Sequence, residues 1–549
     1  MISIGDKQKM SKKIKDLIIG KDAREALSNG VQKVVDAVGT TLGPKGQNVL
    51  IDSGHPSAPS TITKDGVTVI RNLHLNNTVE NLAVKILREA SEKTVDECGD
   101  GTTTTAILGG AIYLEGLKHL VGGANPVMMK RGIDKVVAKL LESLDNIKMD
   151  VTTDDQIRNI ATISANGDEE IGALIVQAMD KVGKDGIITV ESGKSMNDEL
   201  QTTEGMKIDR GFASAYFVTN VTKNTAELTN PLILVTDHEF QTANDVVPLL
   251  EMAHAKSRPL LLIAEGGSAE ALQTLIVNKL KGVASVCAID APGFGARKKE
   301  YLKDIAAMVG AEFVSDDLGI GLNQISFEML GSCEKAIISK FDTILVNSHS
   351  KNGSRETRLA ELKAQMEVAD NPYDIDFYKE RIAKMTGGVA VIRVGGASET
   401  EVEEKKDRVD DALGATYAAV EDGVVVGGGC ALLHAAEAIN PKDLKLANSD
   451  EALGVQIILN AIKQPLKLIV ENGGGSGDFV SETVLAGTDK LGFGYNAVTE
   501  EYGNLFEMGI IDPVKVTKSA LRNAASVATL LLSSKTILMK QNQVQAVVQ

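Results

Sequence analysis

The sequence predicts a multidomain protein of mixed α and α/β class, in which a mostly helical domain is formed by both termini and α/β structure is inserted between them. The chain has 549 residues, which is too long for a single hydrophobic core. Its two ends share an Ala-, Leu- and Val-rich helical texture, whereas strand-like and helix-like segments alternate over residues 204–389. This alternation is typical of a parallel sheet covered by helices.

The composition restricts the possible functions. An apolar share of 43% and a charged share of 24% indicate a folded globular protein. The formal net charge of -16 disfavours nucleic acid as a partner. The four cysteines form no C-x-x-C pair and the seven histidines show no metal-binding spacing, so free thiols in a reducing compartment are expected.

Two further expectations concern membranes and targeting. No apolar run reaches the roughly 18 residues of a membrane helix, so no membrane association is expected. Residues 1–15 are rich in lysine but lack the apolar core of a signal peptide, and we interpret them as an exposed extension.

The first 150 residues are predicted to be mostly helical. Apolar residues at helical spacing indicate helices over 22–38, 79–95, 106–120 and 126–144. A strand is expected over 48–52, after a turn that contains Gly43 and Pro44. The segment 61–70 is expected to form a hairpin around the turn Lys64-Asp65-Gly66, because β-prone residues lie on both sides of it.

Strands and helices then alternate. In chain order we expect a helix over 169–182, a strand over 187–191, a strand over 232–236, a helix over 244–255, a strand over 260–264, a helix over 268–280, a strand over 285–289, a charged helical stretch over 355–384, a strand over 389–394 and a helix over 399–420. The remainder, to residue 539, is expected to be mostly helical.

The turn Gly99-Asp100-Gly101, followed by four threonines and a helical pattern, is the first candidate site. A glycine-framed turn at a helix start offers unpaired backbone N–H groups and the positive end of the helix dipole, which together bind anions. Asp100 would repel a bare phosphate, so it is better explained as a ligand of Mg²⁺ that accompanies the phosphate. Alternatively, Thr102 or Thr103 only caps the helix and Asp100 lies in an ordinary turn.

Three more turns and one carboxylate add to this candidate: Gly43-Pro44-Lys45, Lys64-Asp65-Gly66, the triple glycine at 427–429, and Asp411. Phosphoryl transfer to water requires Mg²⁺, donors around the phosphates and a carboxylate that orients the water. Asp100 as metal ligand, with Asp65 and Asp411 near the water, would meet this requirement. Asp411 could equally be a solvated helix carboxylate, and the triple glycine a helix N-terminal turn. Spacing alone does not show that these segments converge.

Two helices of the inserted part carry more apolar residues than one buried stripe needs. These residues are Val246, Val247, Leu249, Leu250, Leu272, Leu275, Ile276, Val277 and Leu280. Both faces of each helix could be buried, or the helices could form an exposed apolar groove that binds other proteins. Phe212, Tyr216 and Phe217 could extend such a groove.

Several motifs stand together in a specific order. They are Thr41-Leu42-Gly43-Pro44-Lys45-Gly46, Thr63-Lys64-Asp65-Gly66-Val67, Gly99-Asp100-Gly101-Thr102-Thr103-Thr104, Ala291-Pro292-Gly293-Phe294-Gly295, Gly387-Gly388-Val389-Ala390-Val391-Ile392, Asp411-Ala412-Leu413 and Ala497-Val498-Thr499-Glu500-Glu501-Tyr502-Gly503. With this ordered set, the chain resembles a group I chaperonin of the GroEL type over nearly its whole length.

The resemblance implies an ATP-driven protein-folding machine, an ATPase whose subunits form a homo-oligomer of one or two seven-membered rings. Its partners would be non-native polypeptides and a small co-chaperonin lid. It further implies an equatorial ATP-binding domain (1–146 and 423–549), a small α/β intermediate hinge domain (147–203 and 390–422) and an α/β apical domain that binds substrate and lid (204–389).

The resemblance also assigns residues to an ATP site that uses Mg²⁺, with K⁺ as a further candidate ion. Asp100 matches the metal ligand, Asp411 the carboxylate essential for hydrolysis, and Asp65 its partner near the water. The matching nucleotide contacts are Thr41, Leu42, Gly43, Pro44, Lys64, Gly101, Thr102, Thr103, Thr104, Gly428, Asn496, Ala497 and Asp512. The matching substrate- and lid-binding positions are Phe212, Tyr216, Phe217, Val247, Leu250, Leu272, Ile276 and Val277.

The chain departs from the family pattern at a few places. It lacks a Gly-Gly-Met-rich tail, its N-terminus is extended, the loop over 53–60 is longer, and Ala215 replaces a common proline. Such divergence fits a specialised chaperonin in the cytoplasm of a bacterium or of a virus-infected bacterial cell. Two other functions are a ring-forming holdase without turnover and a small-molecule kinase. The three retained aspartates disfavour the holdase, and the apolar helices have no use in a kinase.

Overall fold

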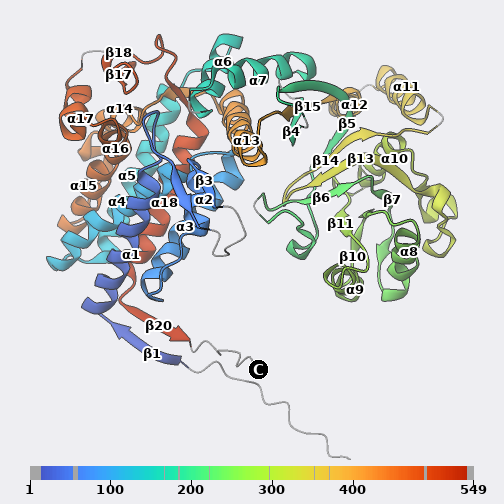
Figure 1. Cartoon of the computed structure of the whole chain (residues 1–549), viewed down its shortest axis with the longest axis horizontal. Helices are drawn as coiled ribbons and strands as arrows, with labels where there is room; N and C mark the ends of the chain where they lie inside the picture. Colours follow the sequence, from blue (N-terminus) through green and yellow to red (C-terminus); the bar gives the residue numbers. More distant parts are fainter. Residues whose placement is uncertain are drawn as a thin grey trace, which may run out of the picture. The chain divides into compact units, whose positions relative to one another are not determined.

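The computed structural model describes residues 14–52, 60–165, 167–183, 186–193, 195–221, 223–295, 297–351, 353–369, 371–487 and 491–540. The chain divides into two compact units (Figure 1). Unit 1 consists of Met1–Val176 and Gly396–Gln549, and unit 2 of Gln177–Gly395. The first 13 residues, most of the loop over 53–60 and the C-terminal tail fall outside the described residues. The division into three domains remains a prediction.

Unit 1 is mostly helical. Its helices are α1 (Lys21–Gly39), α2 (Gly66–Asn72), α3 (Glu80–Cys98), α4 (Thr102–Val121), α5 (Pro126–Ile147), α6 (Asp154–Ser164), α13 (Glu399–Asp422), α14 (Ala431–Glu437), α15 (Ser449–Ala461), α16 (Gln464–Asn472), α17 (Gly477–Ala486) and α18 (Val514–Ser533). The helix α7 (Glu169–Val182) runs across the division between the units. The helices expected in the first 150 residues are confirmed, with α3 and α4 a few residues longer than the apolar pattern indicates.

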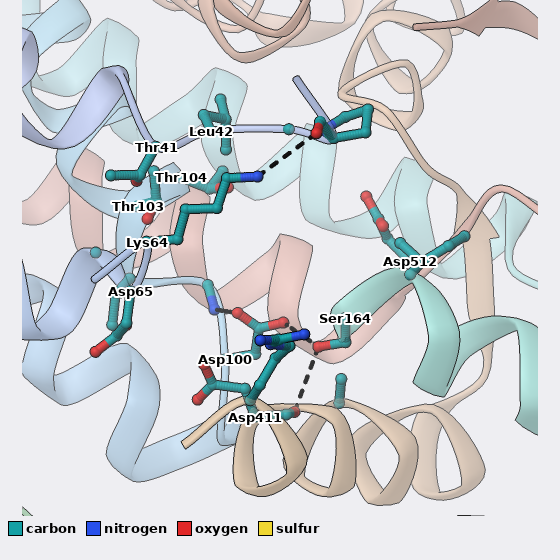
Figure 2. A pocket seen from close by; sticks show the side chains of 18 of the residues that line it. Thr41, Leu42, Lys64, Asp65, Asp100, Thr103, Thr104, Ser164, Asp411 and Asp512 are labelled. Carbon is teal, nitrogen blue, oxygen red and sulfur yellow. Dashed lines mark hydrogen bonds between the residues drawn. The ribbon is translucent and has the colours of Figure 1, made fainter. Parts of the chain in front are cut away.

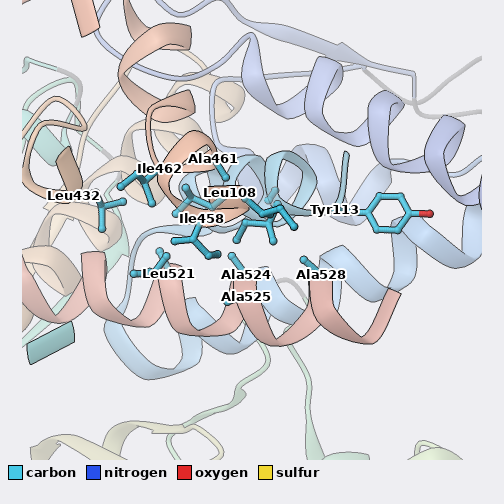
Figure 3. Packing of buried hydrophobic residues seen from close by; sticks show 14 of the residues in the cluster. Leu108, Tyr113, Leu432, Ile458, Ala461, Ile462, Leu521, Ala524, Ala525 and Ala528 are labelled. Atoms are coloured by element: carbon cyan, nitrogen blue, oxygen red, sulfur yellow. The ribbon is translucent and has the colours of Figure 1, made fainter. Parts of the chain in front are cut away.

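Helices from both ends of the chain share one core. In α1, Leu27, Val31 and Val34 recur at helical spacing and are fully buried. The C-terminal helix α18 packs against α3, α4 and α5, and Figure 1 shows it in red among the blue N-terminal helices. In Figure 3, Leu108 of α4, Ile458 of α15 and residues such as Leu521 and Ala524 of α18 pack together. The prediction of one helical domain formed by both termini is therefore confirmed.

Short strand pairs complete unit 1. They are β1 (Ile14–Ile19) with β20 (Thr536–Lys540), β2 (Val49–Ile51) with β3 (Thr61–Thr63), β16 (Val424–Val426) with β19 (Ile511–Pro513), and β17 (Phe493–Asn496) with β18 (Glu501–Asn504), all antiparallel. The hairpin predicted within residues 61–70 is wrong. Residues 61–63 pair instead with β2, and Gly66 begins α2 because the Asp65 side chain caps this helix.

The expectation that no apolar run is long enough for a membrane helix is wrong by length and composition, because one such stretch lies in unit 1. It is Ser449–Asn472, with a mean hydropathy of 1.3, and half of the tested window is buried in the fold. The stretch is divided into α15 and α16, and α15 packs closely against α5. Ile457, Ile458 and Leu466 belong to the hydrophobic core of unit 1. The stretch is therefore buried in the way that helices of a hydrophobic core are.

Unit 2 is built on a ten-stranded sheet. Its strands are β4 (Ile187–Ser192), β5 (Glu199–Ile208), β6 (Ala226–Thr229), β7 (Leu232–Thr236), β9 (Leu260–Ala264), β11 (Val286–Asp290), β12 (Phe313–Val314), β13 (Gly331–Ile338), β14 (Thr343–Ser348) and β15 (Gly388–Val394). The main order is β11-β9-β7-β13-β14-β5-β15-β4, with β12 beside β7 and β6 beside β13. A separate parallel pair is formed by β8 (Glu239–Phe240) and β10 (Gly266–Gly267).

The sheet is only partly parallel. The strands β7, β9 and β11 are parallel, as the alternating pattern predicts, and their side chains are almost all buried. The strands β13, β14, β5 and β15 are antiparallel to their neighbours in that order. The strands β15 and β4, at the other end of the sheet, are parallel to each other. The expectation of a parallel sheet thus holds at the two ends, whereas the sheet as a whole is mixed.

Five helices accompany this sheet: α8 (Ala243–Ala255), α9 (Ala269–Leu280), α10 (Arg297–Val309), α11 (Ser354–Glu367) and α12 (Pro372–Thr386). The charged stretch expected over 355–384 is two helices, because Asn371 caps a new helix that has Pro372 at its first turn. Between α10, α11 and α12, Arg381 and Asp304 are both about 1% exposed and form an ion pair that Arg358 and Glu300 extend.

Candidate functional site

A cavity of about 750 Å³ lies in unit 1, which is the size of a small-molecule site. Every residue predicted to bind nucleotide or metal, or to act in hydrolysis, lines it (Figure 2). The N-terminal part of the chain contributes the segment after α1 with Thr41, Leu42, Gly43 and Pro44, then Lys64 and Asp65 before α2, Asp100 and Gly101 before α4, and Thr102, Thr103 and Thr104 in its first turn. The C-terminal part contributes Asp411 of α13, Gly428 after β16, Asn496 at the end of β17, Ala497 after it, and Asp512 of β19.

The turn between α3 and α4 has the geometry of an anion site. Gly99 and Gly101 adopt φ angles of 76° and 91°, in the left-handed region that favours glycine. No side chain caps the N-terminus of α4, so the first backbone N–H groups of the helix are available to a ligand. The Gly101 N–H donates to Asp100, which lines the cavity.

The threonines after this turn divide into two groups. Thr105 is fully buried and donates to the Gly101 carbonyl at 2.8 Å, so its hydroxyl serves the fold. Thr103 lies against the segment before α2, because a Cβ added to Gly66 would lie only 2.0 Å from the Thr103 Oγ1. This contact brings Asp65 and the start of α4 to the same wall of the cavity.

Asp65 has a structural use as well as a place in the cavity. Its Oδ1 accepts from the Val67 N–H at 2.9 Å, and its Oδ2 accepts from the Thr68 N–H at 2.9 Å and from the Thr68 hydroxyl at 2.6 Å. The helix α2 thus holds the carboxylate in one orientation. The turn Lys64-Asp65-Gly66 is therefore a helix start that presents a carboxylate.

Asp411 lies on α13, lines the cavity and is half-buried. The Ser164 hydroxyl lies 3.0 Å from the Asp100 Oδ2 and 3.4 Å from the Asp411 carbonyl oxygen, so it joins the two segments (Figure 2). The backbones also meet directly, since a Cβ added to Gly414 would lie 2.8 Å from the Gly99 Cα. This position disfavours the alternative that Asp411 is an ordinary solvated helix carboxylate, and a role of Asp411 in hydrolysis stays a prediction.

The clustered carboxylates disfavour one another's charge. Burial and the charges of Asp65 and Asp100 raise the pKa of Asp411 well above its usual range. Burial also raises the pKa of Asp100, as does Asp65, although the Gly101 N–H and the Ser164 hydroxyl oppose this. Burial, assisted by Asp100, raises the pKa of Asp512 to about 7. A bound cation would relieve this repulsion.

The other end of the cavity is formed by β17, β18 and the segment around Asp512. The Asn496 side chain accepts from the Val498 N–H at 2.9 Å and shapes the turn that follows β17. The Tyr495 ring packs on Tyr502 at a centroid distance of 5.1 Å. A Cβ on Gly427 would lie 3.0 Å from the Asp512 Oδ1, so the triple glycine approaches this carboxylate closely. It also precedes α14, as the helix-turn interpretation requires.

Several residues of this site carry no signal in the sequence. The packing of α6 and α13 brings Ser164 and Gly414 beside the turn Gly99-Asp100-Gly101. Arg408 and Tyr495 also line the cavity. Among the residues that the structure describes, no three His, Cys, Asp or Glu side chains are grouped as metal ligands.

In unit 2, the predicted binding residues differ in exposure. Tyr216 is 65% exposed, Val247 37% and Val277 42%, while Phe212, Leu272 and Ile276 are partly buried. Phe217 and Leu250 are buried in the core of unit 2, so they support the surface from beneath. The helices α8 and α9 pack together, and they bury Val246, Leu249 and Leu275 while exposing Val247, Val277 and Leu280. Each helix is thus apolar on its buried face and on part of its exposed face.

Comparisons with known proteins agree with this architecture. The model of the TCP-1/cpn60 chaperonin family matches residues 34–542. The fold is similar to that of the chaperonin gp146 from bacteriophage EL 2 (Pseudomonas aeruginosa), crystallised in the presence of ATP-BeFx. One crystal form gives a TM-score of 0.67 at 26% identity and the other 0.62 at 25%, and each match covers 97% of this chain and 100% of the other. The chain therefore belongs to the TCP-1/cpn60 chaperonin family.

Proposed function

We propose that this chaperonin hydrolyses ATP and uses the cycle to bind and enclose non-native proteins. The observation that carries the proposal is the convergence of Asp65, Asp100 and Asp411, from three distant segments, on one cavity beside the uncapped N-terminus of α4. A nucleotide is the ligand that uses both an anion site and clustered carboxylates. The crystals of the phage chaperonin, grown with an ATP analogue, support the same assignment.

The donor set fits Mg²⁺. This ion prefers oxygen ligands and is usually held by one or two carboxylates together with substrate phosphates and water. Asp100 is the residue that would hold it, since its Oδ2 lies within 3.0 Å of the Ser164 hydroxyl and its Oδ1 accepts from the adjacent Gly101 N–H. When bound, Mg²⁺ neutralises charge that develops on the phosphates during transfer.

The residues of the chain then have distinct roles in hydrolysis. The N–H groups at the start of α4 bind phosphate oxygens, and the hydroxyls of Thr103 and Thr104 are neutral donors beside them. Asp411 orients the attacking water and accepts its proton, a role that its raised pKa favours. Asp65, fixed by α2, holds the water from the other side. Asn496, Ala497 and Asp512 bind the adenosine end.

The remaining parts of the proposal concern assembly. We infer a homo-oligomeric ring, with seven subunits in each ring, and a small co-chaperonin lid that competes with non-native protein for α8 and α9. The exposed apolar residues Val247, Val277 and Leu280 support a protein-binding surface. The likeness to a phage chaperonin supports the cytoplasm of a bacterium, or of a virus-infected bacterial cell, as the place of action.

Replacing one carboxylate tests the hydrolytic assignment. Asp411→Asn preserves the shape of the side chain and is expected to retain ATP binding while steady-state ATP hydrolysis falls at least about 100-fold, the size of effect of a lost general base. The matched control is Glu421→Gln, an exposed carboxylate near the end of α13, which does not line the cavity and should leave turnover within about twofold.

Refolding of a denatured enzyme, measured in the same preparations, separates folding from holding. The native chain should refold it in an ATP-dependent manner and Asp411→Asn should not. Unchanged hydrolysis by Asp411→Asn would refute the assignment of this residue. Capture of the denatured enzyme without ATP hydrolysis by the native chain would instead identify a holdase.

A further inference from the structure

Most of the charged side chains that line the cavity of unit 1 are acidic. Among the described lining residues, eight carry carboxylates: Asp65, Asp100, Glu399, Glu403, Glu404, Asp407, Asp411 and Asp512. Among the described lining residues, Lys64 and Arg408 are the only lysine or arginine side chains. A polyphosphate in such a cavity needs cations, and one Mg²⁺ neutralises only part of its charge. These two side chains are therefore the protein groups most able to bind it.

Arg408 lies on α13 three residues before Asp411, so the two side chains project from neighbouring positions on the same helix face. Both line the cavity. If Asp411 acts on the water that attacks the terminal phosphate, that phosphate is also the group within reach of Arg408. The helix α13 would then present an acidic and a basic group to the same reacting centre.

The guanidinium of Arg408 has an unused donor. Its Nη1 lies 3.3 Å from the Asp168 Oδ2, and its Nη2 donates to Glu404. The Nε is buried and makes no hydrogen bond within the described part of the chain. A buried donor without a partner is unfavourable, and an oxyanion is the partner that a guanidinium binds best.

Lys64 is close enough to the Arg408 guanidinium for the two positive charges to repel each other. Burial lowers the pKa of Lys64, and the positive charge of Arg408 lowers it further, although Glu404 acts in the opposite direction. The Lys64 Nζ lies 3.5 Å from the Pro44 carbonyl oxygen, and Gly66, two residues on, contacts Thr103 in the first turn of α4. The two cations therefore belong to the phosphate end of the cavity, where an anion would relieve their repulsion.

We propose that Arg408 binds the terminal phosphate of ATP and thereby makes the site distinguish ATP from ADP. The proposal rests on the assignment of the cavity as an ATP site. Arg408 and Asp411 both lie on α13. A bond between Arg408 and the terminal phosphate would therefore link the helix that carries Asp411 to ATP, the nucleotide that can be hydrolysed. ADP lacks this phosphate and leaves Arg408 with its carboxylate partners alone.

The test measures nucleotide affinity in the full chain, in an Asp411→Asn background so that ATP is not consumed. Isothermal titration calorimetry with ATP and with ADP, both with Mg²⁺, gives the ratio of the two affinities. Arg408→Gln is expected to weaken ATP about 10- to 100-fold, as the loss of a charge-assisted hydrogen bond does, and to weaken ADP less than about threefold. Arg408→Lys keeps the charge without the planar fork and should give an intermediate ratio.

Two controls separate phosphate binding from a structural role. Lys405→Gln makes the same charge change on α13 away from the cavity lining and should leave the ratio unchanged. Asp168→Asn removes an ion-pair partner of Arg408 and should not weaken ATP selectively. The proposal is overturned if Arg408→Gln weakens ATP and ADP equally, or if Asp168→Asn reproduces its effect. Failure of the Asp411→Asn parent to bind either nucleotide would overturn the ATP site itself and this proposal with it.

Discussion

The contact between Gly99 and Gly414 is expected to control catalysis more than stability. A methyl group at Gly414 would place its carbon 2.8 Å from the Gly99 Cα and 3.0 Å from the Gly99 carbonyl oxygen. These are backbone atoms, so they cannot turn aside as a flexible side chain would. Ordinary van der Waals contact begins near 3.4 Å, so α13 must move away by about 0.6 Å, the difference between the two distances.

This displacement has opposite effects on two free energies. In the folded state, the strain of overpacking costs about 1–3 kcal/mol, whereas alanine is better than glycine inside a helix by about 1 kcal/mol. The net loss of unfolding free energy should thus lie between about 0 and 2 kcal/mol. The activation free energy of hydrolysis has no such compensating term, because Asp411 moves with α13. A misplacement near 1 Å can lower the rate about 100-fold.

We therefore expect Gly414→Ala to lower the turnover number for ATP about 10- to 100-fold while the protein remains folded. Steady-state hydrolysis and chemical denaturation, measured on the same preparation, check the two parts. The control is Gly39→Ala near the end of α1, where the added Cβ would meet nothing closer than the Leu468 Cδ1 at 3.5 Å. Turnover by Gly414→Ala within about twofold of the native value would refute the reasoning that this contact positions Asp411.

Three other outcomes follow from the structure. Asp65→Ala should reduce the unfolding free energy by about 0.5–2 kcal/mol through loss of the α2 cap, whereas Asp65→Asn should retain most of this stability yet slow hydrolysis; equal turnover in Asp65→Asn and the native chain would argue against a role for the charge. Although burial opposes it, hydrogen bonds from Lys303 and Arg358 lower the pKa of Glu300 to about 2. The interactions of ionised Glu300 with Lys303 and Arg358 therefore stabilise the fold above about pH 4.5, and this stabilisation is lost as the pH falls towards 2. Hydrogen exchange in α10 should rise over that pH range, and Glu300→Gln should make the exchange less dependent on pH. Val277→Asp on exposed α9 should abolish capture of a denatured protein without lowering the melting temperature, and unchanged capture would remove this helix from the binding surface.

Periodicity and turn residues are sufficient to predict most of the fold. The strands β7 and β9 begin and end where the apolar runs do, since a buried parallel strand is continuously apolar. The error at residues 61–70 has a local cause. Val67, Val69 and Ile70 are β-branched and favour a strand, but the Asp65 cap and burial against the core stabilise a helix.

The candidate site could be predicted only in part. The turn at Gly99 and Gly101 carries its own signal, because a glycine-framed helix start binds anions in any protein. Asp411 carries none, since a carboxylate in a charged helix is usually solvated. Its place in the cavity depends on the close approach of Gly414 to Gly99 and on the Ser164 hydroxyl, and such long-range packing cannot be obtained from spacing along the chain.

The pairing of β1 with β20 has a consequence for biosynthesis. Ile19 and Thr536 are opposite each other in this ladder, although more than 500 residues separate them along the chain. Unit 2 is continuous in sequence, so all of its strands are synthesised before α13. We expect unit 2 to fold during translation, while α1, α3 and α4 wait for α18 with apolar surface uncovered. The nascent chaperonin subunit would then itself need a chaperone to cover this apolar surface until α18 leaves the ribosome.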